Sequence, residues 1–311
     1  MDGVRAGLQE PVRKDKMSAI LSIPELCEQE RYCVHTPCVY DCSSARACEL
    51  AGYKAILLSG GEVGESMGMV GENEMDASEL AFYAERITEF SPLPLVVDCG
   101  AFKGDPAATY RWSKRLALTG TMGLLIEDEE DIDRDTFLHM VKAGVLACEG
   151  TRCVVIARSN RPLRNAEEID YVVDVLNAAM DEGAYMTMAC GLNTAEKARI
   201  IGERVKGPKM YPDQTIHEGK PEVVDEEIYK YGFKMISYHY TMKVAMAAIV
   251  EYGKKNLEAG NNKPATEEVR LYNGKYGCSA MPMFDYQGKF DRQEAFTGVH
   301  ITAKVPGEEL D

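Results

Sequence analysis

Positive charge and long apolar runs are both scarce in this sequence. Its 311 residues include 35 lysines and arginines against 50 aspartates and glutamates, a formal net charge of −15 at pH 7. A surface of that sign repels phosphate backbones, which argues against a nucleic acid partner. No apolar run approaches the roughly 18 residues that a membrane span requires, and the N-terminal segment has no apolar signal core. We therefore expect a cytoplasmic protein with no membrane span.

Paired cysteine motifs are also absent, although the sequence contains ten cysteines. Cys27, Cys33, Cys38, Cys42 and Cys48 cluster early, at intervals of six, five, four and six residues. No C-x-x-C pair occurs anywhere, which argues against a structural zinc site. A disulfide scaffold would be shorter and richer in loops. We expect reduced thiols that pack as small hydrophobic side chains.

The glycine motifs of nucleotide-binding proteins are missing too. A doubly wound sheet, the competing α/β architecture, would carry G-x-G-x-x-G after its first strand. No such motif follows the first apolar segment, and "SGGEVGESMG" at 59–68 matches neither this fingerprint nor a P-loop. The absence favours another α/β fold.

The sequence does contain a regular alternation of short apolar segments and segments with helical periodicity. The apolar segments are nearly continuous in hydrophobicity, as buried parallel strands are. Eight such pairs over about 220 residues predict a (β/α)8 TIM barrel at 19–260. The expected strands lie at 32–40, 53–59, 94–98, 122–128, 152–158, 184–190, 208–212 and 233–240.

The two ends of the chain differ from this pattern. Residues 1–18 are polar with mixed charge, and we expect a loose N-terminal arm. The stretch "GNNKPATEE" at 260–268 is predicted to be a linker. The segment 261–311 as a whole forms a C-terminal extension, either a lid over the barrel or a strap onto a neighbouring subunit.

Chemistry-bearing residues fall at the carboxyl ends of the expected strands, which is where barrels of this kind place their active sites. Asp98 and Glu127 are hard oxygen ligands suited to Mg²⁺ or Mn²⁺. Arg158 offers a planar fork for a carboxylate, and Ser59 with the N–H groups after it could hold a second anionic end. A metal among them would polarise a carbonyl or stabilise an enolate.

This combination predicts a site for a small-molecule organic acid, either an α-keto acid or a dicarboxylate. The simpler alternative is that Asp98 and Glu127 only cap the following helices or pair with Arg158. The sequence leaves both interpretations open.

Several motifs resemble the isocitrate lyase and phosphoenolpyruvate mutase superfamily. They are "CVYDCSSARACELAGYKAILLSGG", "LPLVVD", "GLLIED", "VVIARSN" and "EEIYKYGFKMISY", in the family's order and spacing over about residues 20–260. The resemblance implies a Mg²⁺-dependent homotetramer that exchanges the helix after the eighth strand between subunits. It also implies chemistry at a C–C or C–P bond next to an enolate.

The resemblance implies roles for particular residues. Asp98 and Glu127 would serve the metal, and Arg158 would bind the substrate carboxylate. The remaining substrate contacts would come from Tyr40, Ser59, Gly60 and Gly61.

Departures from the family pattern are equally informative. The family has D-x-D at the end of the third strand, whereas Gly100 follows Asp98 and Cys99 here. The lyase loop K-[KR]-C-G-H is absent, because "IEDEEDIDRDTFLHMVK" passes almost directly into a helix. Cys190 replaces a glutamate after the sixth strand, and Gly71, next to Glu72, replaces an aspartate.

Three functions remain open. The first is a carbon–carbon bond lyase whose proton donor differs from the family's cysteine; we predict Tyr40, Arg158 and Glu72 as catalytic residues. Further candidates for the acid are Glu62, Glu65, His239 and Cys190, although ordinary packing explains the last two more simply. The second function is phosphonopyruvate mutase or hydrolase chemistry, and the third is a non-catalytic barrel retained for binding or assembly. We also expect a homo-oligomer, a tetramer, built through the apolar helix at 240–257.

Overall fold

The computed structural model describes residues 20–102, 104–213, 216–217, 220–221, 223–276 and 286–300. The N-terminal arm expected at 1–18 lies outside this range. The chain divides into two compact units, Met1–Met242 and Lys243–Asp311, which are described separately.

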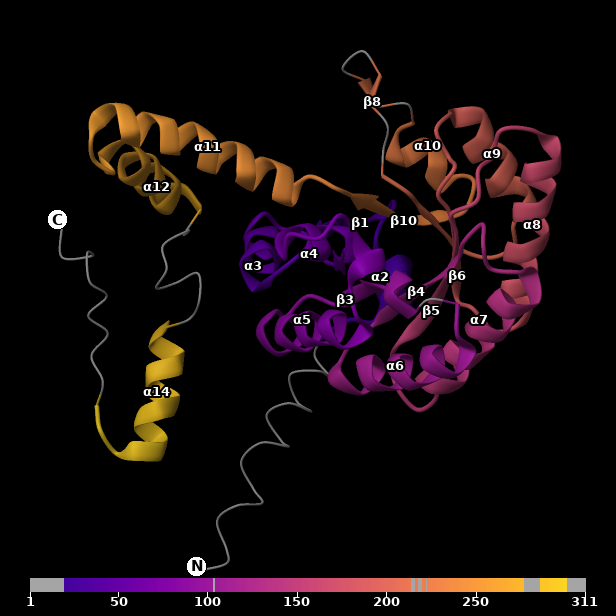
Figure 1. The fold of residues 1–311 in the computed structure, drawn as a ribbon, viewed down its shortest axis with the longest axis horizontal. Coiled ribbons are helices and arrows are strands. Elements are labelled where there is room, and N and C mark those ends of the chain that lie inside the picture. The colour runs from indigo at the N-terminus through magenta and orange to yellow at the C-terminus, as the bar shows by residue number, and fades with distance from the viewer. Residues whose placement is uncertain are drawn as a thin grey trace, which may run out of the picture. The chain divides into compact units, whose positions relative to one another are not determined.

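The first unit is a closed barrel of eight parallel strands surrounded by helices (Figure 1), which confirms the predicted (β/α)8 fold. Going around the barrel, the strand order is β1-β10-β7-β6-β5-β4-β3-β2. The strands are β1 (Val34–Val39), β2 (Ile56–Leu58), β3 (Leu95–Asp98), β4 (Gly123–Asp128), β5 (Val154–Ser159), β6 (Met186–Ala189), β7 (Lys209–Tyr211) and β10 (Phe233–Tyr238).

Two apolar layers hold the barrel together, because alternate residues of a strand point to opposite faces. One layer fills the interior with residues such as Leu57, Val96 and Met235, and the short helix α2 (Ile23–Gln29) adds Ile23 to it. The other layer packs between the strands and the surrounding helices. Since both faces are buried, the strands read as nearly continuous apolar runs in the sequence.

The helices of this unit begin where the sequence supplies caps. Asp105 caps α6 and Pro106 occupies its first turn, as proline prefers. Asp133 caps α7. The helices that follow the strands along the chain are α3 (Cys42–Leu50), α4 (Gly60–Ser66), α5 (Ala77–Phe90), α6 (Pro106–Thr119), α7 (Arg134–Cys148), α8 (Ala166–Asp181), α9 (Ala195–Arg204) and α10 (Asp225–Tyr229).

Some short elements are not evident in the sequence. The glycine-rich stretch after β2 folds into α4, because the Ser59 hydroxyl accepts a hydrogen bond from the Glu62 N–H at 3.2 Å and caps the helix. The other unpredicted elements are the 3₁₀ helices η1 (Glu72–Glu74) and η2 (Gly100–Phe102), and the antiparallel pair β8 (Ile216–His217) and β9 (Lys220–Pro221).

The second unit contains α11 (Thr241–Ala259), α12 (Lys263–Tyr276) and α14 (Tyr286–Thr297). The linker predicted at 260–268 is therefore wrong from Lys263 onward. The Asn261 side chain accepts a hydrogen bond from the Lys263 N–H at 2.9 Å, and Pro264 falls in the first turn, so the polar stretch starts a helix. Among the described helices, none combines the length and apolar character needed to cross a bilayer.

Candidate active site

Three charged residues meet at the carboxyl ends of adjacent strands. Asp98 is the last residue of β3, and Glu127 and Arg158 are register partners on β4 and β5. Asp98 is 7% exposed and Glu127 3%. The parallel register therefore brings the predicted metal ligands and the predicted substrate arginine to one rim.

The Arg158 guanidinium pairs with both carboxylates. Its Nη1 donates to Asp98 Oδ1 and Oδ2 at 2.8 and 2.7 Å, and to Glu127 Oε1 at 3.0 Å. Its Nε donates to Asn160 Oδ1 at 2.7 Å and contacts Cys190 Sγ at 3.1 Å. Nη2 has no hydrogen-bond partner among the described residues, so one donor of the fork is available to a ligand.

The simpler interpretation was that Asp98 and Glu127 only cap the following helices or pair with Arg158, and one part of it is correct. Their ion pairs with Arg158 exist, but neither caps the next long helix, because Asp105 and Asp133 cap α6 and α7. The carboxylates of Asp98 and Glu127 thus face the rim.

Asn160 is a site residue that the sequence analysis did not single out. Its Oδ1 accepts the hydrogen bond from Arg158, while its Nδ2 donates to Glu127 Oε2 at 2.8 Å and contacts Glu129. It holds Glu127 and Arg158 in fixed orientations. The available signal was its place in "VVIARSN", two residues after the arginine.

Glu72 brings a third carboxylate to the cluster, from η1 after α4. One oxygen from each of Glu72, Asp98 and Glu127 lies within 4.8 Å of the other two. Glu72 Oε2 is buried and has no hydrogen-bond partner among the described residues. An unpaired buried carboxylate oxygen beside two other carboxylates fits a site for a divalent cation.

The electrostatics of the cluster agree with this interpretation. Burial opposes the ionisation of Asp98, but Arg158 outweighs it, so the pKa of Asp98 lies below its usual value. Burial and the Asp98 charge raise the pKa of Glu127 well above its usual value. The Asp98 charge, together with burial, raises the pKa of Glu72 to about 8. A single arginine cannot neutralise three carboxylates, so the ionisation of one opposes the ionisation of the others.

The remaining predicted substrate contacts lie after β1 and β2. The buried Ser59 hydroxyl caps α4. Gly60 lies against the Glu72 carboxylate, since a Cβ there would be 2.3 Å from Oε2, whereas a Cβ on Gly61 would make only an ordinary contact with Ser59 Oγ at 3.8 Å. Tyr40, directly after β1, is half-buried, and burial raises its pKa, so the phenol keeps its proton at neutral pH.

The alternative acids occupy different surroundings. Glu62 is buried and accepts a hydrogen bond from Thr241 Oγ1 at 3.3 Å, and Glu65 is exposed. The Nδ1 atom of His239 lies 3.6 Å from Oδ2 of Asp213. Their places leave Glu72 as the glutamate of the predicted set that joins the cluster.

Cys190 contacts Arg158 from the end of β6. Burial raises the pKa of its thiol, although Arg158 opposes this shift. Cys190 therefore behaves as a neutral thiol in the wall of the site, as its ordinary packing interpretation predicts. The nine cysteines among the described residues are free thiols.

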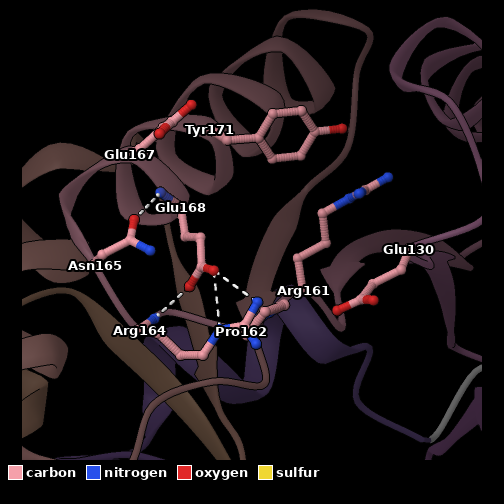
Figure 2. A pocket seen from close by; sticks show the side chains of 8 residues that line it. All are labelled: Glu130, Arg161, Pro162, Arg164, Asn165, Glu167, Glu168 and Tyr171. Atoms are coloured by element: carbon pink, nitrogen blue, oxygen red, sulfur yellow. Dashed lines mark hydrogen bonds and ion pairs between the residues drawn. The ribbon is translucent and has the colours of Figure 1, made fainter.

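Two cavities lie near the strand ends. One, of about 280 Å³, adjoins the cluster through Gly100 and Glu127 and continues under the loop between β4 and α7. The other, of about 440 Å³, lies beside the start of α8 (Figure 2). Of these two cavities, the 280 Å³ cavity is thus the one that reaches the cluster, at Glu127.

The two arginines beside the second cavity are already paired. Arg164 bonds to Glu168 at 2.9 Å (Figure 2), and Arg161 bonds to the buried Asp128 at 3.0 Å and lies over the Tyr171 ring. These residues stabilise the loop after β5, and we do not assign a ligand to this hollow.

Comparison with known proteins identifies the family. The family model "Phosphoenolpyruvate phosphomutase" matches residues 25–257 of the chain. The chain belongs to this family. The prediction of the isocitrate lyase and phosphoenolpyruvate mutase superfamily is confirmed. Members of the superfamily are lyases and mutases, so the prediction of an enzyme is confirmed as well.

Similar sequences of this phosphomutase family include several lyases. The 2-methylisocitrate lyase of Aeropyrum pernix is 24% identical over 261 residues, covering 80% of this chain and 83% of that protein. The 2-methylisocitrate lyase of Escherichia coli is 24% identical over 262 residues, covering 79% and 87%. An oxaloacetate decarboxylase of Bradyrhizobium diazoefficiens is 32% identical over 119 residues, covering 37% and 38%.

Solved structures share the fold of this chain. A 2,3-dimethylmalate lyase has a TM-score of 0.72 and 24% identity, covering 89% of this chain and 99% of that one. An oxaloacetate acetylhydrolase in complex with its product oxalate has a TM-score of 0.74 and 22% identity, covering 91% and 98%. These similarities show that this member of the phosphomutase family has the same fold as the two solved structures.

Proposed function

We propose that the protein is a Mg²⁺-dependent lyase, with Mn²⁺ as an alternative ion, that breaks a carbon–carbon bond of an α-keto acid or dicarboxylate through an enolate. The observation that carries the proposal is the buried cluster of Glu72, Asp98 and Glu127 beside Arg158. Three carboxylates with one guanidinium leave negative charge uncompensated, which a divalent cation would neutralise.

Asp98 and Glu127 are the residues that would hold the ion. When bound, it would act as a Lewis acid toward the oxygens of an α-keto acid and favour the enolate. Asn160 fixes the orientation of Glu127 through its 2.8 Å hydrogen bond, which is the supporting role that residues behind metal ligands usually have.

Arg158 is the proposed partner of the substrate carboxylate. Its Nη2 has no hydrogen bond to the described residues, and its side chain reaches the rim from β5. Gly60 and Gly61, with Ser59, are the proposed contacts for the other end of the acid. The adjoining cavity of about 280 Å³ suits a small ligand better than a large one.

Tyr40 is the proposed proton donor. Burial raises the pKa of Tyr40, so its phenol is protonated at neutral pH and can donate to a substrate oxygen. Only five residues, Glu129–Asp133, separate β4 from α7, so the family's cysteine loop has no counterpart there. With Tyr40 and Arg158, Glu72 completes the proposed catalytic set by adding its carboxylate to the cluster.

Phosphonate chemistry is the second candidate, because the family model carries the name of a phosphomutase. The similar sequences carry the names of carbon–carbon lyases and a decarboxylase. The lysine and asparagine loop of the phosphonate enzymes is also absent, and so we place the carbon–carbon reaction first.

Titration calorimetry with Mg²⁺ and oxalate, an analogue of the pyruvate enolate, tests the proposal. We expect wild type to bind both ligands and Asp98→Ala to lose Mg²⁺ binding while the barrel stays folded. Asp135→Ala, an exposed carboxylate on α7, provides a control with the same change in net charge. Equal Mg²⁺-dependent oxalate binding by wild type and Asp98→Ala would remove Asp98 from the site, and a wild type that binds neither ligand would overturn the proposed function.

A further inference from the structure

The carboxylate of Glu72 occupies the space that a side chain at residue 100 would need. A Cβ on Gly100 would lie 2.7 Å from Glu72 Cδ and 2.9 Å from each of its oxygens. These distances are shorter than real Cβ contacts, so the Glu72 carboxylate would have to leave its place to admit a side chain at residue 100. Residue 100 and residue 72 therefore compete for one volume next to Asp98.

The backbone around Glu72 is shaped for this position. Gly60 forms a second wall, because its Cβ would lie 2.3 Å from Glu72 Oε2. On the neighbouring turn of α4, Gly64 packs against the Gly71 carbonyl, 3.0 Å from where a Cβ would be. Gly60 and Gly64 of α4, with Gly100 of η2, thus allow η1 to approach the strand ends closely enough to deliver a carboxylate.

We propose that Glu72 supplies the third carboxylate of the metal site in place of a side chain at residue 100. The inference rests on the proposed function, in which Asp98 and Glu127 bind a divalent cation. Gly100 lacks the acidic side chain expected there, and Glu72 restores it from a different loop. The carboxylate is therefore at residue 72 and the glycine at residue 100.

The surroundings of Glu72 match a ligand better than a packed or paired side chain. Within the described part of the chain, Glu72 Oε2 is buried without a hydrogen-bond partner, and no lysine or arginine forms an ion pair with Glu72. Its oxygen lies within 4.8 Å of those of Asp98 and Glu127. A carboxylate that only stabilised the fold would be expected to have found a donor, since an unpartnered buried oxygen is costly.

Four variants test the exchange: Glu72→Ala, Gly100→Asp, the double variant Glu72→Ala/Gly100→Asp, and Glu74→Ala, an exposed glutamate on the same 3₁₀ helix, as the control. The measurement is the affinity for Mn²⁺, by titration calorimetry and by the spin-resonance signal of bound Mn²⁺, without substrate. Thermal unfolding of each variant shows whether the barrel remains folded. Glu72→Gln keeps the shape of the side chain and replaces Glu72→Ala if that variant is unfolded.

We expect Glu72→Ala or Glu72→Gln to weaken Mn²⁺ binding by about tenfold or more, and Glu74→Ala to leave it unchanged. Gly100→Asp alone should also bind weakly, because two carboxylates cannot share the volume. The double variant should recover most of the wild-type affinity.

Two results would overturn the inference while leaving the proposed function in place. One is an affinity of Glu72→Ala equal to that of wild type. The other is a folded double variant that binds no more tightly than Glu72→Ala. A wild type that binds no Mn²⁺ would instead overturn both the metal site and the role of Glu72 in it.

Discussion

Individual carboxyl groups set the charge balance at this barrel rim. Arg158 compensates Asp98, and the pKa of Asp98 falls as a result, while the pKa values of Glu127 and Glu72 rise. A cation that enters the cluster favours the ionised form of these carboxyl groups, so its binding is linked to pH. Without metal, the same linkage affects the stability of the fold.

The pH dependence of stability tests the state of Glu72 in metal-free protein. Its native pKa of about 8 lies above the ordinary 4.5, so the native state holds an extra proton between these values. The stabilisation from this group is therefore complete below pH 4.5 and is lost as pH rises through 8. Because glutamine cannot ionise, Glu72→Gln should not lose this stabilisation at high pH. We expect its free energy of unfolding at pH 8 to exceed that of wild type by roughly 2 kcal/mol or more.

Urea unfolding at pH 5 and pH 8 with a chelator gives this comparison. Glu74→Gln serves as the control, because Glu74 is exposed on the same helix. A difference between Glu72→Gln and wild type that is the same at both pH values would contradict the assignment.

Some site residues were predictable from the sequence and others were not, for a physical reason. Asp98, Glu127 and Arg158 end apolar strands, and parallel strands of a barrel place their ends together. Glu72 and Gly100 depend on a close approach of two loops, and Asn160 depends on side-chain hydrogen bonds, neither of which has a periodic pattern. The position of Glu72 in the carboxylate cluster therefore required coordinates.

At the scale of elements, α4 and η1 together place Glu72. The α4 helix was not predictable from the sequence, because a glycine-rich stretch is typical of a loop. A serine cap and close packing make it a helix. The strands and long helices were predictable from their apolar periodicity. The start of α12 was not, since Asn261 caps a stretch whose composition suggests a linker.

A glycine substitution in α4 tests whether this packing controls the metal site. Gly64→Ala would place a Cβ 3.0 Å from the Gly71 carbonyl and push η1 outward by a few tenths of an ångström. We expect Mn²⁺ affinity to fall roughly threefold to tenfold, although Glu72 itself is retained. Gly71→Ala is the control, because its φ of 172° suits any residue and its Cβ would meet open space. Equal affinities for the two variants would show that the α4 contact does not position Glu72.

At the scale of the whole molecule, α11 has the character of an interface helix. No residue of α11 is buried in the described part of the chain. The exposed residues include four large apolar ones on one side of the helix: Met246, Ile249, Val250 and Leu257. Apolar side chains at this spacing form a stripe that is normally covered. This supports the proposed homo-oligomer, a tetramer, built partly through α11.

Mass measurement in solution tests the assembly. We expect wild type to be a stable oligomer at micromolar concentration and Ile249→Glu to dissociate it, because a charge would be buried in the contact. Lys255→Glu, on the side of α11 opposite the apolar stripe, should leave the oligomer intact. A wild-type monomer would refute the proposal, and an intact Ile249→Glu oligomer would exclude this stripe as the contact.

The most direct test of the metal-dependent site is anomalous diffraction from crystals grown with Mn²⁺ and oxalate. The account predicts a manganese peak among the carboxylates of Asp98, Glu127 and Glu72, with oxalate beside it and Arg158 bonded to the oxalate. The contradicting result is a rim without a manganese peak, in which Arg158 still bridges Asp98 and Glu127 as described above.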